Sequence, residues 1–153
     1  MKKPVIDETK LPEVEGIIED ADSIMSELYC EDDDDLRKDL EELQSRLRDI
    51  TGKQDIQIKD YWNYYEAVSL ETAARGALMP PPEKEDVTDE QIRDIVVHIL
   101  DYDEAEMDWW ILYLEVNTGL VNLSDYIFYP ELAGLDEDAS IEEIAEKILE
   151  DRK

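Results

Sequence analysis

The chain has 153 residues, 42% of them hydrophobic, which is enough for one or two small folded domains. Its 43 Asp and Glu against 15 Lys and Arg give a formal net charge of −28, which repels nucleic acid and anionic lipid and argues against direct binding to DNA, RNA or a membrane. A basic protein partner suits this charge because opposite potentials speed association, although acidity that serves only solubility is an open alternative.

The sequence gives no sign of export or of a membrane anchor. The stretch MKKPVIDETK has lysines but no apolar run behind them, and no segment reaches the ~18 apolar residues of a membrane span. The single cysteine, Cys30, cannot form an internal disulfide. We therefore expect a cytoplasmic protein.

Three helices are predicted in the first 80 residues, at about 13–29, 33–50 and 59–79. In the first two, apolar residues recur at spacings of three and four. Pro12 suits the first turn of the first helix, and the acidic run at 31–35 suits the N-terminus of the second, where carboxylates oppose the helix dipole.

The third predicted helix contains Ser69, whose hydroxyl suits an internal N-cap. Ahead of it, the IQIK stretch at 56–59 is the one plausible strand fragment. The aromatic stretch KDYWNYYEAV at 59–68 is predicted to pack the two parts of the chain together, with a second contact surface as the alternative.

Three consecutive prolines, Pro80 to Pro82, form the best internal boundary, since they cannot continue a helix and favour an extended segment. We expect an N-terminal helical region at 1–80 and a second domain at 81–153. The first carries 21 acids against 10 bases, net −11, and the second 22 against 5, net −17. The shorter part is the more acidic.

Beyond the prolines, Thr88 with Gln91 forms a capping-box pattern before TDEQIRDIVVHIL, whose apolar residues through Leu100 share one face. A second helix is predicted from about Asp103 to Asn117, ended by a Thr-Gly pair. A further capping-box pattern at Ser140 opens the last helix. The predicted fold class is all-α.

Residues able to carry catalysis or bind metal are scarce. His98 lies alone among apolar neighbours, and Cys30 is followed by five acids that raise a thiol pKa. The three acid-rich segments lack the glycine and the terminal glutamate of a calcium-binding loop. We expect no enzymatic activity, no cofactor and no metal.

Residues 124–130 read SDYIFYP, an aromatic stretch too short for an ordinary helix and stopped by Pro130. With the capped helices around it, this stretch resembles the colicin-type immunity proteins, which bind and silence nuclease bacteriocins. The resemblance covers about residues 86–152. In that family an opening like D-x-T-x-x-E starts the first helix, where this chain has DVTDEQ. A very short third helix reads D-L-I-Y-Y-P, where this chain has DYIFYP.

The resemblance implies a four-helix domain whose short third helix presents an acid and an aromatic pair to the toxin. Carried over, these anchors are Asp125, Phe128 and Tyr129; Phe128 stands where the family has tyrosine and so lacks one hydroxyl. The second helix would supply the residues that select the toxin. These are Glu104, Met107, Asp108, Ile111, Leu112 and Glu115.

Some of the nearby apolar residues must instead fill the core. We expect Ile127, and secondarily Tyr126, to face inward from the short helix. On the preceding helix we expect Trp110, Leu114 and one of Trp109 or Tyr113 to do so, because tryptophan pairs usually fill space between helices.

The leading hypothesis is a cytoplasmic immunity protein, monomeric when free, that binds a basic toxin nuclease beside its active cleft. One alternative is a DNA mimic that inhibits a restriction or other nucleic-acid-binding protein through charge alone. Another is an acidic adaptor without inhibitory activity. Salt separates the first two, because a pure charge mimic loses nearly all its affinity as salt rises.

Overall fold

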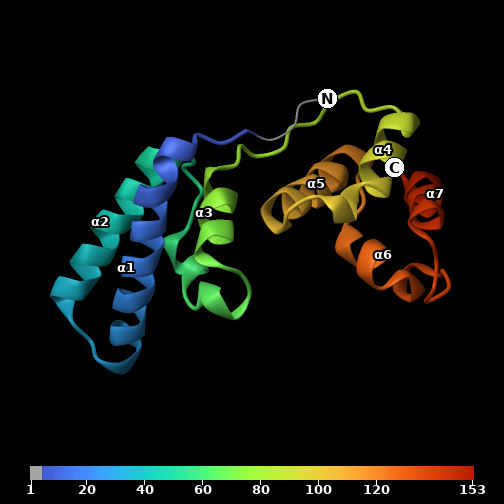
Figure 1. The fold of residues 1–153 in the computed structure, drawn as a ribbon. Helices are drawn as coiled ribbons and strands as arrows, with labels where there is room; N and C mark the ends of the chain where they lie inside the picture. The colour runs from blue at the N-terminus through green and yellow to red at the C-terminus, as the bar shows by residue number, and fades with distance from the viewer. Residues whose placement is uncertain (1–4) are drawn as a thin grey trace. The chain divides into compact units, whose positions relative to one another are not determined.

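The computed structural model describes residues 5–153, and this part of the chain contains α-helices and short 3-10 turns but no strand. The predicted all-α class is confirmed. The chain divides into two compact units between Pro80 and Pro81 (Figure 1). Among the described residues, no helix combines the length and apolarity needed to cross a membrane.

The first unit is built on three helices, α1 (Leu11–Cys30), α2 (Asp34–Thr51) and α3 (Leu70–Leu78). The long α1 packs against both α2 and α3. Its apolar stripe meets two leucines of α2 and three alanines of α3, whose small side chains allow close approach. The buried residues are Leu11, Val14, Ile17, Ile18, Ala21, Met25, Leu43, Leu47, Ile58, Ala73, Ala74 and Ala77.

The ends of α1 and α2 follow the sequence signals. Pro12 lies in the first turn of α1. At the start of α2, the Asp33 carboxylate accepts hydrogen bonds from the amides of Asp35 and Leu36, so the acidic run supplies a cap as predicted. At its end, Gly52 adopts a left-handed conformation with φ 71°.

The single helix predicted at 59–79 is wrong. Two 3-10 turns, η2 (Ile58–Tyr61) and η3 (Tyr64–Glu66), precede α3, which begins only after Ser69. Trp62, with an extended backbone, ends the first turn, and Asn63, with φ 58°, is the left-handed residue from which the second turn starts. Ser69 does cap α3, by accepting from the amide of Thr72.

The predicted strand fragment at 56–59 is also wrong, because a side chain takes the place of a strand partner. Gln44 of α2 donates to the Ile56 carbonyl at 2.8 Å and accepts from the Ile58 amide at 2.8 Å. These two bonds satisfy the backbone on either side of Gln57 without a sheet.

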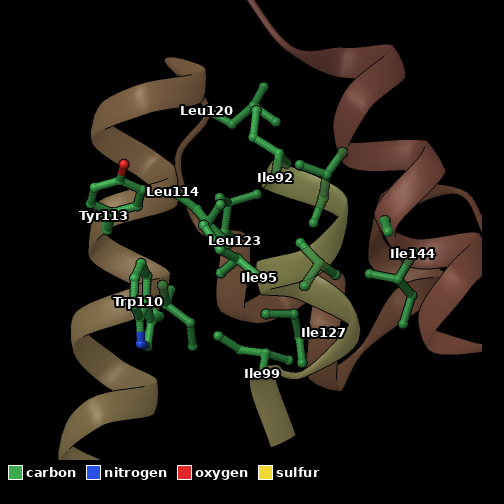
Figure 2. Packing of buried hydrophobic residues seen from close by; sticks show 14 of the residues in the cluster. Ile92, Ile95, Ile99, Trp110, Tyr113, Leu114, Leu120, Leu123, Ile127 and Ile144 are labelled. Atoms are coloured by element: carbon green, nitrogen blue, oxygen red, sulfur yellow. The ribbon is translucent and has the colours of Figure 1, made fainter. Parts of the chain in front are cut away.

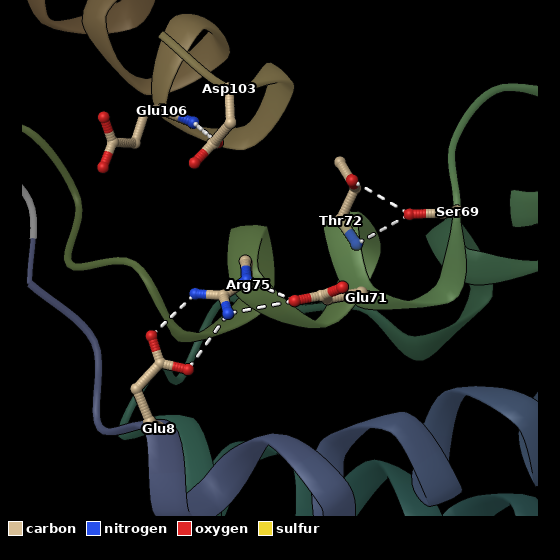
Figure 3. Close-up of polar contacts among 7 residues, drawn as sticks. All are labelled: Glu8, Ser69, Glu71, Thr72, Arg75, Asp103 and Glu106. Carbon is tan, nitrogen blue, oxygen red and sulfur yellow. Dashed lines mark hydrogen bonds and ion pairs between the residues drawn. The ribbon is translucent and has the colours of Figure 1, made fainter.

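An arginine ties the start of the first unit to α3. Arg75 donates to both carboxylate oxygens of Glu8, in η1 (Glu8–Lys10), at 2.7 and 3.1 Å, and to Glu71 one turn earlier on α3 (Figure 3). These hydrogen bonds, to Glu8 first and then to Glu71, raise the pKa of Arg75. The contact joins residues 67 positions apart in the sequence.

The second unit contains α4 (Asp89–Val97), η4 (Ile99–Asp101), α5 (Glu104–Thr118), α6 (Leu123–Phe128), η5 (Pro130–Ala133) and α7 (Ile141–Asp151). The last helix, α7, packs along α4, and the short α6 contacts both α5 and α7. Figure 2 shows the apolar side chains that meet between these helices. They include Ile92, Ile95, Ile99, Trp110, Leu114, Leu123, Ile127 and Ile144.

Side-chain caps open α4, α5 and α7, whereas α6 begins after Asn122 without one. Thr88 and Gln91 form the predicted capping box, with both reciprocal bonds present. Asp103 caps α5 by accepting from the Glu106 amide (Figure 3), and Ser140 caps α7 by accepting from the Glu143 amide. The predicted first helix is too long by three residues, because α4 ends at Val97 and Leu100 lies 60% exposed.

The buried side chain of Asn117 binds the backbone of the segment that leads into α4. The Asn117 side chain accepts from the Glu85 amide at 2.7 Å and donates to the Glu83 carbonyl at 3.1 Å. Beside it, the Tyr113 hydroxyl donates to Glu85 Oε2 at 2.7 Å. Burial and this carboxylate raise the pKa of Tyr113.

Candidate protein-binding surface

The short helix α6 is held by two residues that face the core. Leu123 is fully buried, and Ile127 follows one turn later, as expected. Tyr126 is partly buried against the same core, and its hydroxyl donates to Asp151 Oδ2 of α7 at 2.8 Å. One face of α6 is therefore fixed by both apolar and polar contacts.

The two residues at the end of α6 face outward. Phe128 is 46% exposed and Tyr129 is 56% exposed. Tyr129 leaves the helical conformation, with φ −136° and ψ 64°, while its amide still donates to the Asp125 carbonyl at 2.8 Å. Pro130, itself buried, then prevents continuation because it has no amide hydrogen to donate. The helix stops where its aromatic pair reaches solvent.

Five of the six candidate residues on α5 are exposed or only partly buried. Glu104, Asp108 and Leu112, spaced four residues apart, are exposed and share one side of the helix. Glu115, three residues after Leu112, is partly buried. Val116, which the sequence reasoning did not single out, continues the exposed stripe and could have been found by its position four residues after Leu112.

The prediction that Ile111 contacts a partner is wrong. Ile111 is only 7% exposed and lies in the core cluster, next to Trp110 and Leu114. Met107 is partly buried against the same cluster. The error arises because α5 carries apolar residues on nearly every side, so their spacing does not identify the inner face.

The aromatic residues of α5 form a stack on its inner side. Trp110 and Leu114 are buried as predicted, and of the remaining pair Tyr113 is the buried one. Trp109 is stacked on Tyr113 with ring centroids 5.5 Å apart. These rings stiffen α5 behind its exposed stripe.

The segment of the sequence that contains α5 and α6 is strongly acidic. Between Arg93 and Lys147 the sequence contains no Lys or Arg. Those two residues are themselves paired with carboxylates on α7, at 2.6 and 3.2 Å. On α5, partial desolvation and then the Glu104 carboxylate raise the pKa of Asp108, as expected where acidic groups face one another.

Further apolar side chains are exposed on the segments that lead into and out of α6. Val121 and Leu132 are the most exposed of them. The sequence reasoning did not single them out, since an isolated apolar residue in a loop carries no periodic signal. They widen the apolar surface offered by this part of the unit.

The structure also places the residues considered above for catalysis or metal binding. Within 5–153, no group of three or more His, Cys, Asp and Glu side chains is arranged to hold a metal ion. His98 is an exposed side chain beside Asp94 and Asp101, and Cys30 is an exposed free cysteine.

Comparisons with models of known families, with curated proteins and with solved structures found no match. The resemblance to immunity proteins therefore depends on the residues of α4 to α7 alone.

Proposed function

We propose that this protein is an immunity-type inhibitor whose second unit binds and neutralises a basic toxin, of which a nuclease domain is the best candidate. The observation that supports this most directly is the exposed pair Phe128 and Tyr129, held at the end of a short helix whose other face is buried. Such a pair offers large contact area with few rotatable bonds, the property that makes aromatics favoured interface anchors.

The surrounding charge supports a partner that normally binds nucleic acid. A nuclease holds phosphate with Lys and Arg, and the stretch from α5 through α6 presents carboxylates with no Lys or Arg of its own. This surface would attract those cations and compete with the phosphates. In this proposal the inhibitor binds beside the cleft and excludes nucleic acid by repulsion and obstruction.

Selectivity in this proposal comes from the exposed stripe of α5. Glu104, Asp108 and Leu112 reach solvent on a helix fixed by its buried aromatic face. Because α5 and α6 are in contact, a partner that binds α6 could also contact α5. Changing the stripe should change which toxin binds, whereas changing the anchor should weaken every toxin.

The test requires a partner, and the proposal predicts where one is encoded: a basic nuclease domain directly upstream of this gene. Calorimetric titration of that domain with the full chain measures affinity, and a nuclease assay measures inhibition. Tyr129→Ala should weaken binding more than tenfold, since truncating an aromatic anchor costs ~2 kcal/mol or more.

Leu100→Ala is the matched control. Leu100 is similarly exposed and belongs to the same unit but lies outside the proposed surface, so this variant should bind normally. Circular dichroism should show unchanged helix content in both variants. Undiminished binding by Tyr129→Ala would show that the anchor is assigned to the wrong residues.

The DNA-mimic alternative is favoured by the 22 acids against 5 bases of residues 81–153. It requires charge but no aromatic contact. Affinity measured from low to high salt separates the two, because the aromatic anchor should preserve much of the binding at high salt. A fall to background at high salt, with Tyr129→Ala indistinguishable from the original protein, would favour the mimic.

A further inference from the structure

A second exposed aromatic pair lies in the first unit, independent of the surface on α6. Tyr29, at the end of α1, is 78% exposed, and Trp62, between the two 3-10 turns, is 37% exposed. Their ring centroids are 5.4 Å apart and the planes are inclined by 45°. We call them the Tyr29–Trp62 pair.

Hydrogen bonds to α1 fix this pair in place. The Trp62 indole Nε1 donates to Ser26 Oγ at 3.1 Å. The next residue, Asn63, is in the left-handed conformation, and its amide donates to Asp22 Oδ1 at 2.7 Å. Asp22, Ser26 and Tyr29 follow one another at helical spacings of four and three, so they share one side of α1.

The core of the first unit does not require these rings. The buried cluster on α1 consists of other residues, from Leu11 to Met25, and neither member of the pair belongs to it. Trp62 is thus held by a polar contact to α1, and Tyr29 packs against its ring while most of the Tyr29 side chain stays in water. Such an arrangement preorganises a binding surface.

The carboxylates of α1 beside the aromatic turn favour a cationic ligand, although Lys59, whose carbonyl accepts from the Trp62 amide, lies in the preceding turn η2. Helix α1 has no Lys or Arg from Leu11 to Cys30, and it carries Glu19 and Asp22 near the aromatic turn. At the neighbouring Tyr64, partial desolvation and then these two carboxylates raise the pKa of the hydroxyl. Nucleic acid and anionic lipid would be repelled here.

We propose that the Tyr29–Trp62 pair binds an arginine-bearing segment of a basic protein. A guanidinium can stack on the faces of Trp and Tyr by cation–π attraction, and its N–H groups can donate to nearby carboxylates. Lysine fits less well, because its ammonium is a compact, strongly hydrated charge. The first unit thereby supplies a contact of its own, whatever the second unit binds.

The test follows the indole N–H signals of the ¹⁵N-labelled full chain by NMR. The chain has three tryptophans, and the Trp62 signal is identified by its absence in Trp62→Phe. The probe is a short uncharged-end peptide of alternating glycine and arginine. The same peptide with citrulline, a neutral relative of arginine, measures what remains without the charge.

We expect the arginine peptide to shift the Trp62 signal in a saturable way and the citrulline peptide to leave it in place. Tyr29→Ala should weaken this binding about fivefold, within the range of cation–π energies. Because Tyr29 is mostly exposed, this variant should remain folded. Tyr129→Ala has the same net charge and should bind the peptide normally, which separates this surface from the one on α6.

Three outcomes would overturn the proposal. In one, Tyr29→Ala binds the arginine peptide as well as the original protein does, which would show attraction by net charge alone. In another, the citrulline peptide shifts Trp62 equally. In the third, a short oligothymidine shifts Trp62 instead of the peptide, which would assign the pair to base stacking.

Discussion

The short helix α6 should be sensitive to the loss of one buried side chain, and Ile127→Ala tests this directly. Ile127 and Leu123 are the two buried residues of this six-residue helix. Phe128 and Tyr129 depend on them for their position, because the aromatic pair has no comparable burial of its own. Ile127→Ala should therefore both destabilise the second unit and loosen the proposed anchor.

The magnitude follows from the atoms removed. Isoleucine to alanine deletes three carbons, worth about 0.8 kcal/mol each when fully buried. The sum is about 2.4 kcal/mol, and incomplete collapse of the resulting cavity raises the expected loss to about 3 kcal/mol. A unit of this size has roughly 4 to 11 kcal/mol in total. The variant should fold, with a markedly lower free energy of unfolding.

Urea unfolding followed by tryptophan fluorescence provides the measurement. A Trp62→Phe background leaves Trp109 and Trp110 as the remaining tryptophans, and both are on α5. Their signal then reports the second unit. Tyr129→Ala in the same background should lose less than about 1 kcal/mol, as expected for an exposed side chain. If Ile127→Ala also loses less than 1 kcal/mol, the buried face of α6 is not what holds it.

Two further changes test smaller features. The Tyr126 hydroxyl is the main cause of the lowered pKa of Asp151, so its stabilising effect is complete above the unfolded pKa of about 3.8 and is lost as pH falls through the lower folded value. Tyr126→Phe should cost about 1 kcal/mol near pH 7 and less near pH 3 by urea unfolding; an equal cost at both would contradict the linkage. Gly119→Ala should destabilise by more than the ~1 kcal/mol expected for Gly52→Ala. Both glycines have positive φ, but only at Gly119 does an added Cβ meet a neighbour, Lys153 Cβ at 3.2 Å; equal melting shifts would show that this contact relaxes freely.

Local signals in the sequence predicted much of the fold. Capping residues such as Thr88 and Asp33 bond backbone amides within three positions, so their effect is encoded nearby. The prediction of a single helix at 59–79 was wrong for the opposite reason, because the interruption of that helix depends on a distant residue. It requires Asn63 to take a left-handed conformation stabilised by Asp22, which lies 41 positions earlier. The spacing of apolar residues within one segment carries no information about a hydrogen-bond partner that lies so far away in the sequence.

The candidate surface was predictable in part. The stop at Pro130 indicated where α6 ends, and the burial of Ile127 on the opposite face follows from its spacing from Leu123. Ile111 was misplaced because α5 lies against neighbours that its own sequence does not reveal. A helix that is apolar on most sides is oriented by those neighbours, and only the tertiary structure shows which stripe they cover.

The absence of Lys and Arg from α5 through α6 has a consequence for the free protein. Its carboxylates repel one another when no partner is bound, and dissolved cations screen that repulsion. In the proposed complex, the Lys and Arg side chains of a basic toxin would replace these dissolved cations. In that proposed complex, binding would stabilise the second unit, and the free protein should be more stable at high salt than at low salt.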